Sequence, residues 1–421
     1  MRRARLLILA STIGMLGWGT VLPYQYAYAA NTRGWGGLVA AGASSLFSIG
    51  ALVAAPVAGR LTDRLDPVRV FVVAKLVAAL GTGSLLLAET PGLFLAGMFV
   101  FGVGLTGAGP AQSVLVLRWV GQADRRRVFA WQFTGQALGM AVGSFVAGYL
   151  VDLHRPHGMW PAFAAAAIGF TVSAALVAAT GLGPAAEPEP VARPEEAATG
   201  TGSAGIRLIL ASPALRWTAL VTVTLALGFY AQFESGLPAY AITVLSVPER
   251  TVGTASAVNC LVIILLQMVV TRFTAGRSAP ALLVVVGAIW VASWGLLALA
   301  DHVPALAGAL FVTAFGVFAL GETMYAPVLN PLTASLAPAG MVGTTLGVFS
   351  ALQTGVSAAG PLLAGLALSG GTGGVFLAAH VGISVLAVGS AWRLWVLLRR
   401  TPAEAPVASH SEPAPAPAPV A

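Results

Sequence analysis

Two acidic residues, Glu322 and Glu234, lie in long apolar stretches of this 421-residue chain. Between Glu322 and Arg393 there is no other Asp, Glu, Lys or Arg. A carboxylate inside a bilayer costs roughly 2.5–3.5 kcal/mol on insertion scales, so it is usually kept for a function such as carrying a proton or binding a cation. The alternatives are structural: Glu322 could hydrogen-bond to a neighbouring helix, and Glu234 could lie in water at the outer interface.

Polar and aromatic residues elsewhere in the apolar stretches could complete a site around these carboxylates. Tyr325 follows Glu322 at i+3 and shares its helical face, and Tyr230 precedes Glu234 by one turn. Aromatic faces beside a carboxylate suit a cationic ligand. The sequence therefore predicts a substrate or proton site that also includes Tyr24, Gln25, Gln136, Asn259 and Gln353.

The composition is that of a membrane protein. Mean hydropathy is +0.86 and 9% of residues are charged, against about 25% in soluble domains. The single cysteine, Cys260, lies in an apolar stretch, which excludes a disulfide framework and a thiolate metal site. No zinc-protease, nucleophile-elbow or phosphate-loop motif occurs, and the GxGxxG pattern at 102–107 lies inside an apolar stretch without a preceding strand. We therefore expect no enzyme activity, no metal and no cofactor.

Charged and turn-forming residues divide the chain into twelve apolar stretches, each close to the roughly 20 residues that span a bilayer. The first begins after three arginines and resembles a signal peptide, but it is long enough to span and is read as an uncleaved helix. Pro238, Pro327, Pro331 and Pro361 are expected to break or kink their helices. The predicted spans are 6–29, 36–58, 70–88, 92–117, 129–151, 159–181, 215–240, 252–271, 280–300, 304–329, 343–368 and 374–397.

The positions of the basic residues predict the orientation. With the N-terminus inside, eighteen arginines fall on the inner side and only Arg33, Arg155 and Arg250 fall outside. Short cytoplasmic loops carry such an excess, so both termini are predicted to be cytoplasmic. The formal charge of +7 follows this topology and does not indicate binding to nucleic acid. The preference for arginine over lysine suggests a bacterial inner (plasma) membrane.

The chain divides into two related halves. Residues 182–212 are rich in Pro, Glu, Ala, Gly and Ser and predict a cytoplasmic linker between six-helix bundles at 1–181 and 213–400, while 401–421 predict a disordered cytoplasmic tail. A shift of 217 places 94–148 on 311–365 with twelve identities in 55 positions, among them Gly104/Gly321. The predicted fold is an all-α membrane protein with twelve transmembrane helices in two pseudo-symmetric six-helix bundles.

The loop between the second and third spans reads Gly-Arg-Leu-Thr-Asp-Arg-Leu-Asp-Pro-Val-Arg, residues 59–69. Its charge alone equally suits an ordinary cytoplasmic loop. The order Gly-x-Leu-x-Asp-Arg, however, resembles the signature loop of major facilitator superfamily (MFS) transporters, and the paired halves are similar to the architecture of that family. The resemblance implies a gating role for Gly59, Asp63, Arg64 and Arg69. Gly59 would allow close backbone approach, and Arg118 is the predicted salt-bridge partner of Asp63.

Other family signatures are kept only in part. Met98 stands where many members carry an arginine linked to proton coupling, and Ser144 replaces the proline that ends the glycine ladder of antiporters. The eleventh span supplies that glycine–proline pair instead. Small residues at such spacings allow helices to pack closely in lipid. Helix packing is therefore predicted at Gly139, Gly143, Gly148, Gly360, Pro361 and Gly365.

The sequence therefore predicts a monomeric secondary transporter that moves a small molecule across the bilayer by alternating access. The acidic and aromatic candidates favour proton-linked efflux of a small amphipathic or cationic compound, as in an antiporter. Met98 and Ser144 leave a second interpretation open, uncoupled or uptake transport of a neutral metabolite. A third interpretation, of another class, is a membrane sensor or scaffold that does not transport.

Overall fold

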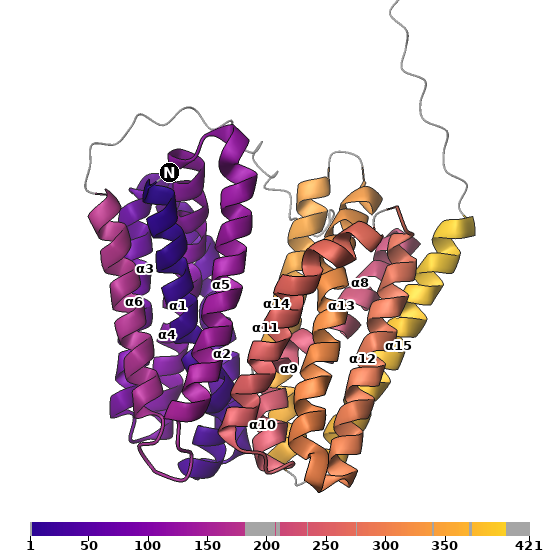
Figure 1. The fold of residues 1–421 in the computed structure, drawn as a ribbon. Coiled ribbons are helices and arrows are strands. Elements are labelled where there is room, and N and C mark those ends of the chain that lie inside the picture. Colours follow the sequence, from indigo (N-terminus) through magenta and orange to yellow (C-terminus); the bar gives the residue numbers. More distant parts are fainter. Residues whose placement is uncertain are drawn as a thin grey trace, which may run out of the picture.

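The computed structural model describes residues 2–400 apart from 182–206, 208–210, 234, 275, 339–340 and 370–372. These residues form two bundles of helices that lie side by side, with no strand among them (Figure 1). The first bundle consists of α1 (Arg2–Ala27), the π-helical turn η1 (Tyr28–Thr32), α2 (Gly37–Arg64), α3 (Pro67–Ser84), η2 (Leu85–Leu87), α4 (Pro91–Trp119), α5 (Gln122–Leu150) and α6 (Trp160–Gly181).

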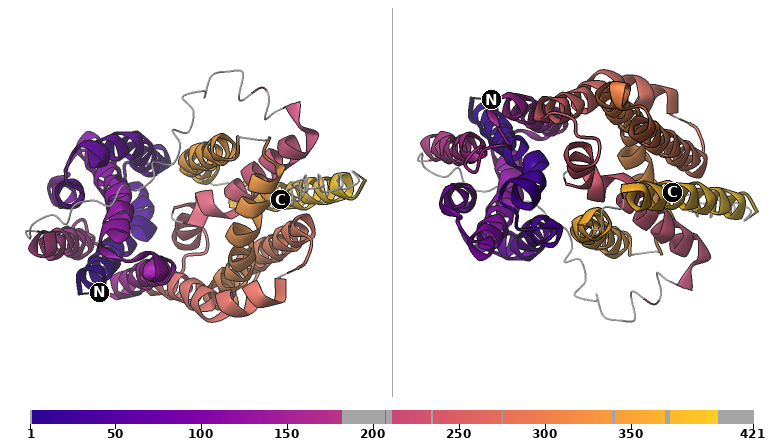
Figure 2. Two further views of the ribbon diagram at one scale, coloured as in Figure 1. Left: turned by 90° about the horizontal axis from the view of Figure 1, so that it is seen from above. Right: turned by 90° about the horizontal axis from the view of Figure 1, so that it is seen from below.

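The second bundle begins with a helix in several pieces. These are α8 (Pro213–Leu225), the π-helical turn η3 (Ala226–Tyr230), α9 (Ala231–Phe233) and α10 (Gly236–Thr243). It continues with α11 (Glu249–Thr274), α12 (Ala279–His302), η4 (Pro304–Leu306), α13 (Ala307–Leu336), α14 (Val342–Ser369) and α15 (Gly373–Arg400). Views along the helix axes show the two bundles as separate groups (Figure 2).

The predicted fold class is confirmed. Eleven spans in the described part of the chain are long and apolar enough to cross a membrane. The remaining long helix, α5, is also 29 residues long, but it is rich in glycine and polar residues. It packs against α1 and against α11 of the other bundle, and its other face exposes large hydrophobic side chains such as Phe133 and Tyr149, as a lipid-facing helix does. The two bundles of six spans are those of an all-α membrane protein.

Glycines set the close contacts of α5 with α1. A Cβ at Gly139 would overlap the backbone of Thr12, and one at Gly143 would overlap the backbone of Leu16. Gly360 of α14 lies in the same way against Ala231, in the first span of the second bundle. Small residues thus bring each of these helices against the first span of its own half, as expected where helices pack in lipid.

Of the four prolines expected to break or kink their helices, Pro238 lies beside a break and the other three lie inside continuous helices. Pro327 and Pro331 lie inside α13 and Pro361 lies inside α14, and none of these helices ends there. The seventh span instead breaks at η3 and again before Gly236, upstream of Pro238. Membrane helices accept an internal proline because neighbouring groups satisfy the freed carbonyl. Single π-helical turns are often found at functional sites.

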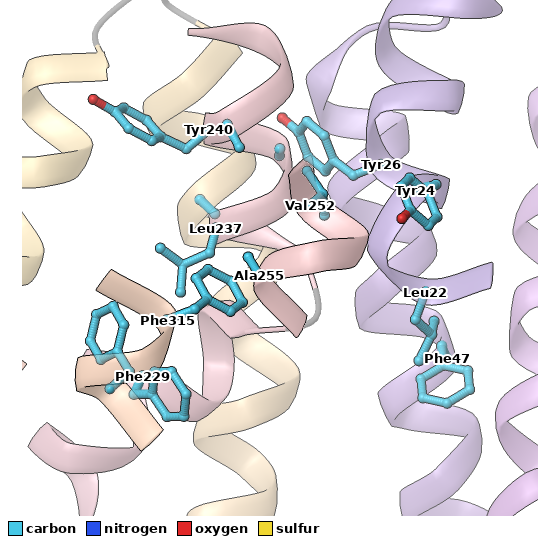
Figure 3. Packing of buried hydrophobic residues seen from close by; sticks show 14 of the residues in the cluster. Leu22, Tyr24, Tyr26, Phe47, Phe229, Leu237, Tyr240, Val252, Ala255 and Phe315 are labelled. Carbon is cyan, nitrogen blue, oxygen red and sulfur yellow. The ribbon is translucent and has the colours of Figure 1, made fainter. Parts of the chain in front are cut away.

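The bundles contact each other towards the end of the molecule opposite Arg2 and Arg400, as Figure 1 shows. The Ser45 hydroxyl of α2 donates to the Ala358 carbonyl of α14 at 2.9 Å. Gly365 of α14 lies against Ala41 of α2. In the close-up, Tyr26 extends from α1 towards the second bundle (Figure 3). We call this the outer end, and the end that carries Arg2 and Arg400 the inner end.

Candidate functional site

A cavity of about 140 Å³ lies between the two bundles. Both bundles contribute to its wall, and the described residues that line it carry hydroxyls and one amide but no charged side chain. The first bundle supplies Leu22, Ser44, Phe47 and Ser48, and the second supplies Tyr230, Ala231, Ser235, Gln353, Ser357 and Pro361. Because α2 and α14 face each other here, a ligand in this cavity would touch both halves of the protein.

A second cavity, of about 290 Å³, lies in the second bundle between α8, α13 and α14. Gln353 lines both cavities. Ser350, Gln353 and Ser357 are spaced i, i+3 and i+7 on α14 and therefore share one helical face. Together they form a polar strip from the central cavity towards Asn330 and Thr333 near the inner end of α13.

The Glu322 carboxylate of α13 is half-buried beside the central cavity. The Asn259 amide of α11 donates to Glu322 Oε2 at 3.5 Å and to the Phe315 carbonyl at 3.3 Å. The Tyr230 hydroxyl also donates to Glu322. Since Tyr230 lines the cavity, its hydroxyl connects the cavity wall to the carboxylate.

Aromatic rings pack around Tyr230, whose hydroxyl donates to Glu322. The rings of Tyr230 and Tyr325 are 5.2 Å apart, and that of Trp290 lies 5.9 Å from Tyr325. The π-helical turn η3 ends at Tyr230. The structure thus brings together Glu322, Tyr325, Tyr230 and Asn259, four residues that the sequence marks as candidates on three different spans.

Several buried polar atoms near the central cavity have no hydrogen-bond partner among the described residues. They are Gln25 Oε1, Gln232 Oε1, Ser235 Oγ and the Tyr325 hydroxyl. A buried polar atom without a partner costs about 1–3 kcal/mol. Water or a polar ligand in the cavity would reduce that cost. Gln25 also donates through Nε2 to Ser44 Oγ, which lines the cavity.

Other predicted site residues lie elsewhere. Tyr24 points to the outer end, where its hydroxyl donates to the Ser144 carbonyl at 2.8 Å and to the Glu249 carbonyl at 3.3 Å. Gln136 is half-buried on α5, and no hydrogen bond between described residues joins it to Glu322. Glu234 lies outside the described residues, as does most of the predicted linker 182–212 and the whole tail 401–421.

The loop that resembles the family signature forms the tight turn between α2 and α3. Arg118 Nη1 lies 3.9 Å from Asp66 Oδ1, and Asp66 also caps α3 by accepting from the Val68 N–H at 3.3 Å. The described partner of Arg118 is therefore Asp66, whereas Asp63 was predicted; the side chain of Asp63 is not among those described. Arg64 and Arg69 are exposed.

The close backbone approach predicted at Gly59 is not found. A Cβ there would meet no atom within 4 Å. At the outer end the outcome differs, because a Cβ at Gly148 would lie 3.0 Å from the Arg250 Cα of the other bundle. Gly148 and Gly365 are related by the sequence repeat, and each lies where the two bundles meet.

Some lining residues carry no signal in the sequence. Ser44, Ser48, Ser235 and Ser357 are single hydroxyls in apolar helices, where serine commonly bonds to its own helix backbone. That these four serines line one cavity follows only from the way the two bundles pack against each other. Met98 is buried, and Ser144 Oγ donates to the Gly19 carbonyl of α1 at 3.1 Å.

A sequence model of the Major Facilitator Superfamily matches residues 7–361. This chain belongs to the Major Facilitator Superfamily. As an MFS protein it is a membrane transporter and not an enzyme, in agreement with the sequence prediction. No curated protein sequence matches the chain.

Solved structures share the MFS fold at low identity. The nucleoside transporter NupG aligns with a TM-score of 0.72 and 13% identity, over 94% of this chain and 99% of NupG. A peptide transporter POT in complex with sulfate gives 0.73 and 18%, over 95% and 94%. A bacterial homologue of the human lysosomal transporter Spinster, inward-facing and occupied, gives 0.69 and 14%, over 94% and 96%. At such low sequence identity, the structural similarity shows a shared fold, and the substrate of this chain does not follow from it.

Proposed function

We propose that this chain is a proton-linked MFS exporter of a small amphipathic cation, with Glu322 as the residue that exchanges proton and substrate. The observation that supports the proposal is the Glu322 carboxylate beside the cavity wall, hydrogen-bonded by Tyr230 and Asn259. A carboxylate attracts a cation, and the faces of tyrosine and tryptophan rings add cation–π attraction. In the described part of the chain, no Lys or Arg that would repel such a substrate lines either cavity.

In the proposed cycle, proton and cation compete for one carboxylate. Ionised Glu322 accepts the hydrogen bonds of Tyr230 and Asn259 and holds the cation against the rings of Tyr230 and Tyr325. A proton on Glu322 removes the negative charge, so the cation leaves to the side that is open at that moment. Protonated Glu322 is neutral, and the bundles then rock back without the cost of moving a charge through a closed cavity.

The contacts at the outer end would hold the inward-open state of this cycle. Glu249 of α11 accepts from the Leu153 N–H of the first bundle at 3.2 Å, and the Tyr24 hydroxyl donates to the Glu249 carbonyl. Gly148 and Gly365 bring the backbones close at the same end. Export requires these contacts to separate while the inner end closes around the α2–α3 turn.

The decisive variant is Glu322→Gln, which keeps the shape of the side chain but cannot take up a proton. Purified protein in liposomes is supplied with a fluorescent amphipathic cation such as ethidium, with and without a pH gradient. We expect the gradient to drive dye transport by the unmodified protein and not by Glu322→Gln. The matched control is Glu89→Gln, which removes an exposed carboxylate near the outer end. Gradient-driven transport that survives in Glu322→Gln would refute the proposal.

A second candidate function is uncoupled transport of a neutral metabolite. The observation that favours it is the set of described residues around the central cavity, whose hydroxyls and Gln353 amide offer hydrogen bonds to a substrate and carry no charge. In the same liposomes, flux of a neutral hydroxylated compound that ignores the pH gradient and survives Glu322→Gln would support this candidate. No flux of either kind would indicate the sensor or scaffold.

We also propose that the inner end faces the cytoplasm of a bacterium and that the protein works as a monomer. The arginine excess at that end supports the orientation. Cys260 is buried, so single cysteines introduced on a Cys260→Ser background report their own side. We expect Ala197→Cys to be labelled only from the cytoplasm and Arg155→Cys only from outside. Labelling on the opposite sides would reverse the proposed direction of transport.

A further inference from the structure

An apolar groove of about 220 Å³ lies on the first bundle, away from the central cavity. Residues of α2, α3 and α4 line it, and none of the second bundle does. Its sides include Val57 and Leu61 of α2 and Val73 of α3, and Gly107 of α4 belongs to its floor. Val57 is 49% exposed, Leu61 42% and Val73 59%. In a membrane protein such an apolar, exposed rim lies against lipid.

The groove exists because α2 and α3 diverge from their tight turn while α4 passes beneath them. Gly104 packs against the Ala78 backbone of α3, and a Cβ at Gly107 would be 3.5 Å from the Ala74 Cβ. No side chain at Gly107 fills the space between the helices. Along α2 the lining extends from Leu65 to Ala54, which is about 16 Å at 1.5 Å per residue. That depth is about half of the roughly 30 Å hydrocarbon core, the thickness of one leaflet.

Among the described residues that line this otherwise apolar groove, Arg69 is the one that carries a charge. It lies in the first turn of α3 at the inner end and is exposed, as are Arg60 and Arg64 of the preceding helix end. The nearby Asp66 carboxylate lies within ion-pair distance of Arg118 and caps α3. Among the described carboxylates none forms an ion pair with Arg69. The mouth of the groove therefore carries positive charge at the depth where phospholipid phosphates lie.

We propose that this groove binds an anionic phospholipid of the inner leaflet, with one acyl chain between α2 and α3 and the phosphate on Arg69. The arginine fork fits a phosphate through paired, charge-assisted hydrogen bonds. The groove is about one leaflet long. It therefore accommodates one acyl chain of the lipid, while the second acyl chain stays in the bilayer. This lipid site is independent of the transported substrate and of Glu322.

The test is lipid binding to the purified full-length protein in detergent. Native mass spectrometry counts bound lipids, and the thermal unfolding midpoint reports their effect. The probes are phosphatidylglycerol and phosphatidylcholine with identical acyl chains. We expect phosphatidylglycerol to bind with higher affinity and to raise the midpoint. Arg69→Gln should weaken phosphatidylglycerol binding about fivefold, because a partly exposed charged hydrogen bond is lost.

Two further variants separate headgroup from chain. Arg277→Gln removes an exposed arginine at the corresponding turn between α11 and α12, so it is the matched control and should bind phosphatidylglycerol as the unmodified protein does. Val73→Trp places an indole on the exposed rim of the groove, where it competes with the acyl chain, so it should weaken binding of both lipids.

Three outcomes would overturn the proposal. Equal affinity for the two lipids would remove the role of Arg69, as would equal losses in Arg69→Gln and Arg277→Gln. Full lipid binding by Val73→Trp would place the lipid elsewhere. A concentration-dependent dimer that is lost in Val73→Trp would show that a second copy of the chain covers this face.

Discussion

The first span of each half shows how the two bundles differ. In the first bundle α1 runs unbroken through Pro23 from Arg2 to Ala27. In the second bundle the corresponding span, which carries Pro238, is divided into α8, η3, α9 and α10. The division places Tyr230 against Glu322. In the last turn of the unbroken helix, the Tyr24 hydroxyl instead donates to the Ser144 carbonyl at the outer end. The first span is thus a continuous helix, whereas the corresponding span of the second bundle is interrupted and contributes Tyr230 to the candidate site.

The repeat-related glycines of α4 and α13 show the same contrast. Gly104 lets α4 touch the backbone of α3 at Ala78. Gly321 instead makes room for the Trp290 ring, whose Nε1–H donates to the Phe318 carbonyl at 3.2 Å. The next residue is Leu105 in the first half and Glu322 in the second. At this position the first bundle has a direct backbone contact between two helices. In the second bundle the ring of Trp290 separates the helices next to Glu322.

The largest effect is expected from moving the carboxylate between the halves. In the double variant Glu322→Leu with Leu105→Glu, coupled transport should fall to the level of empty liposomes, because Tyr230 and Asn259 stay beside position 322 while the carboxylate moves to the other bundle. The measurement is gradient-driven dye flux. Flux in the double variant equal to that of the unmodified protein would show that a carboxylate works equally well in either half, and would contradict the assignment of the site to the second bundle.

The next effect concerns stability at the paired glycines. Gly104→Ala places a Cβ inside the Ala78 backbone, which cannot move without shifting α3, so we expect a loss of about 2–3 kcal/mol. Gly321→Ala meets the Trp290 side chain, which can shift, and should cost about 1 kcal/mol. Thermal or denaturant unfolding in detergent compares the two. Equal losses would mean that the second bundle is packed as rigidly as the first.

A smaller effect is expected at the buried cation of the first bundle. Lys75 is 3% exposed, and its Nζ lies 5.5 Å from the ring centres of Phe71 and Phe170. No ion pair joins it to a described carboxylate. Lys75→Met keeps the length and removes the desolvated charge, so unfolding should become harder by about 1 kcal/mol with transport unchanged. Loss of transport would instead place chemistry in the first bundle as well.

The smallest effect is expected at the outer contact. Tyr24→Phe removes hydrogen bonds to the Ser144 and Glu249 carbonyls, a change of about 0.5–1.5 kcal/mol. The population with the outer end open should therefore rise a few-fold. Distances between spin labels placed on the α1–α2 and α10–α11 loops measure this population. Unchanged distances would mean that Gly148 and Gly365 hold this end without the hydroxyl.

Hydrophobic length and charge made most of the fold predictable. A spanning helix must be long and apolar whatever surrounds it, so eleven of the twelve predicted spans also stand out by length and hydropathy in the described structure. The prolines had different outcomes, because α13 and α14 continue through Pro327 and Pro361 whereas the seventh span is interrupted just before Pro238. The close backbone approach expected at Gly59 was wrong, since it depends on how α2, α3 and α4 meet.

The candidate site was predictable in its charged and aromatic members and not in its hydroxyls. Glu322 stands out because a carboxylate is costly in lipid, and Tyr325 follows from its spacing on one helix. Ser44 and Ser357 lie more than 300 positions apart in the sequence, and no local rule connects them.

The sequence by itself determined the number of spans, the repeat and the presence of a membrane carboxylate, because each follows from the cost of placing polar groups in lipid. Only the tertiary structure decided that Tyr230 and Asn259 meet Glu322, that Tyr24 turns to the outer end and that a groove opens beside Arg69. Those outcomes depend on side-chain volumes where helices cross, and such contacts are settled by packing among distant segments rather than by any one stretch of chain.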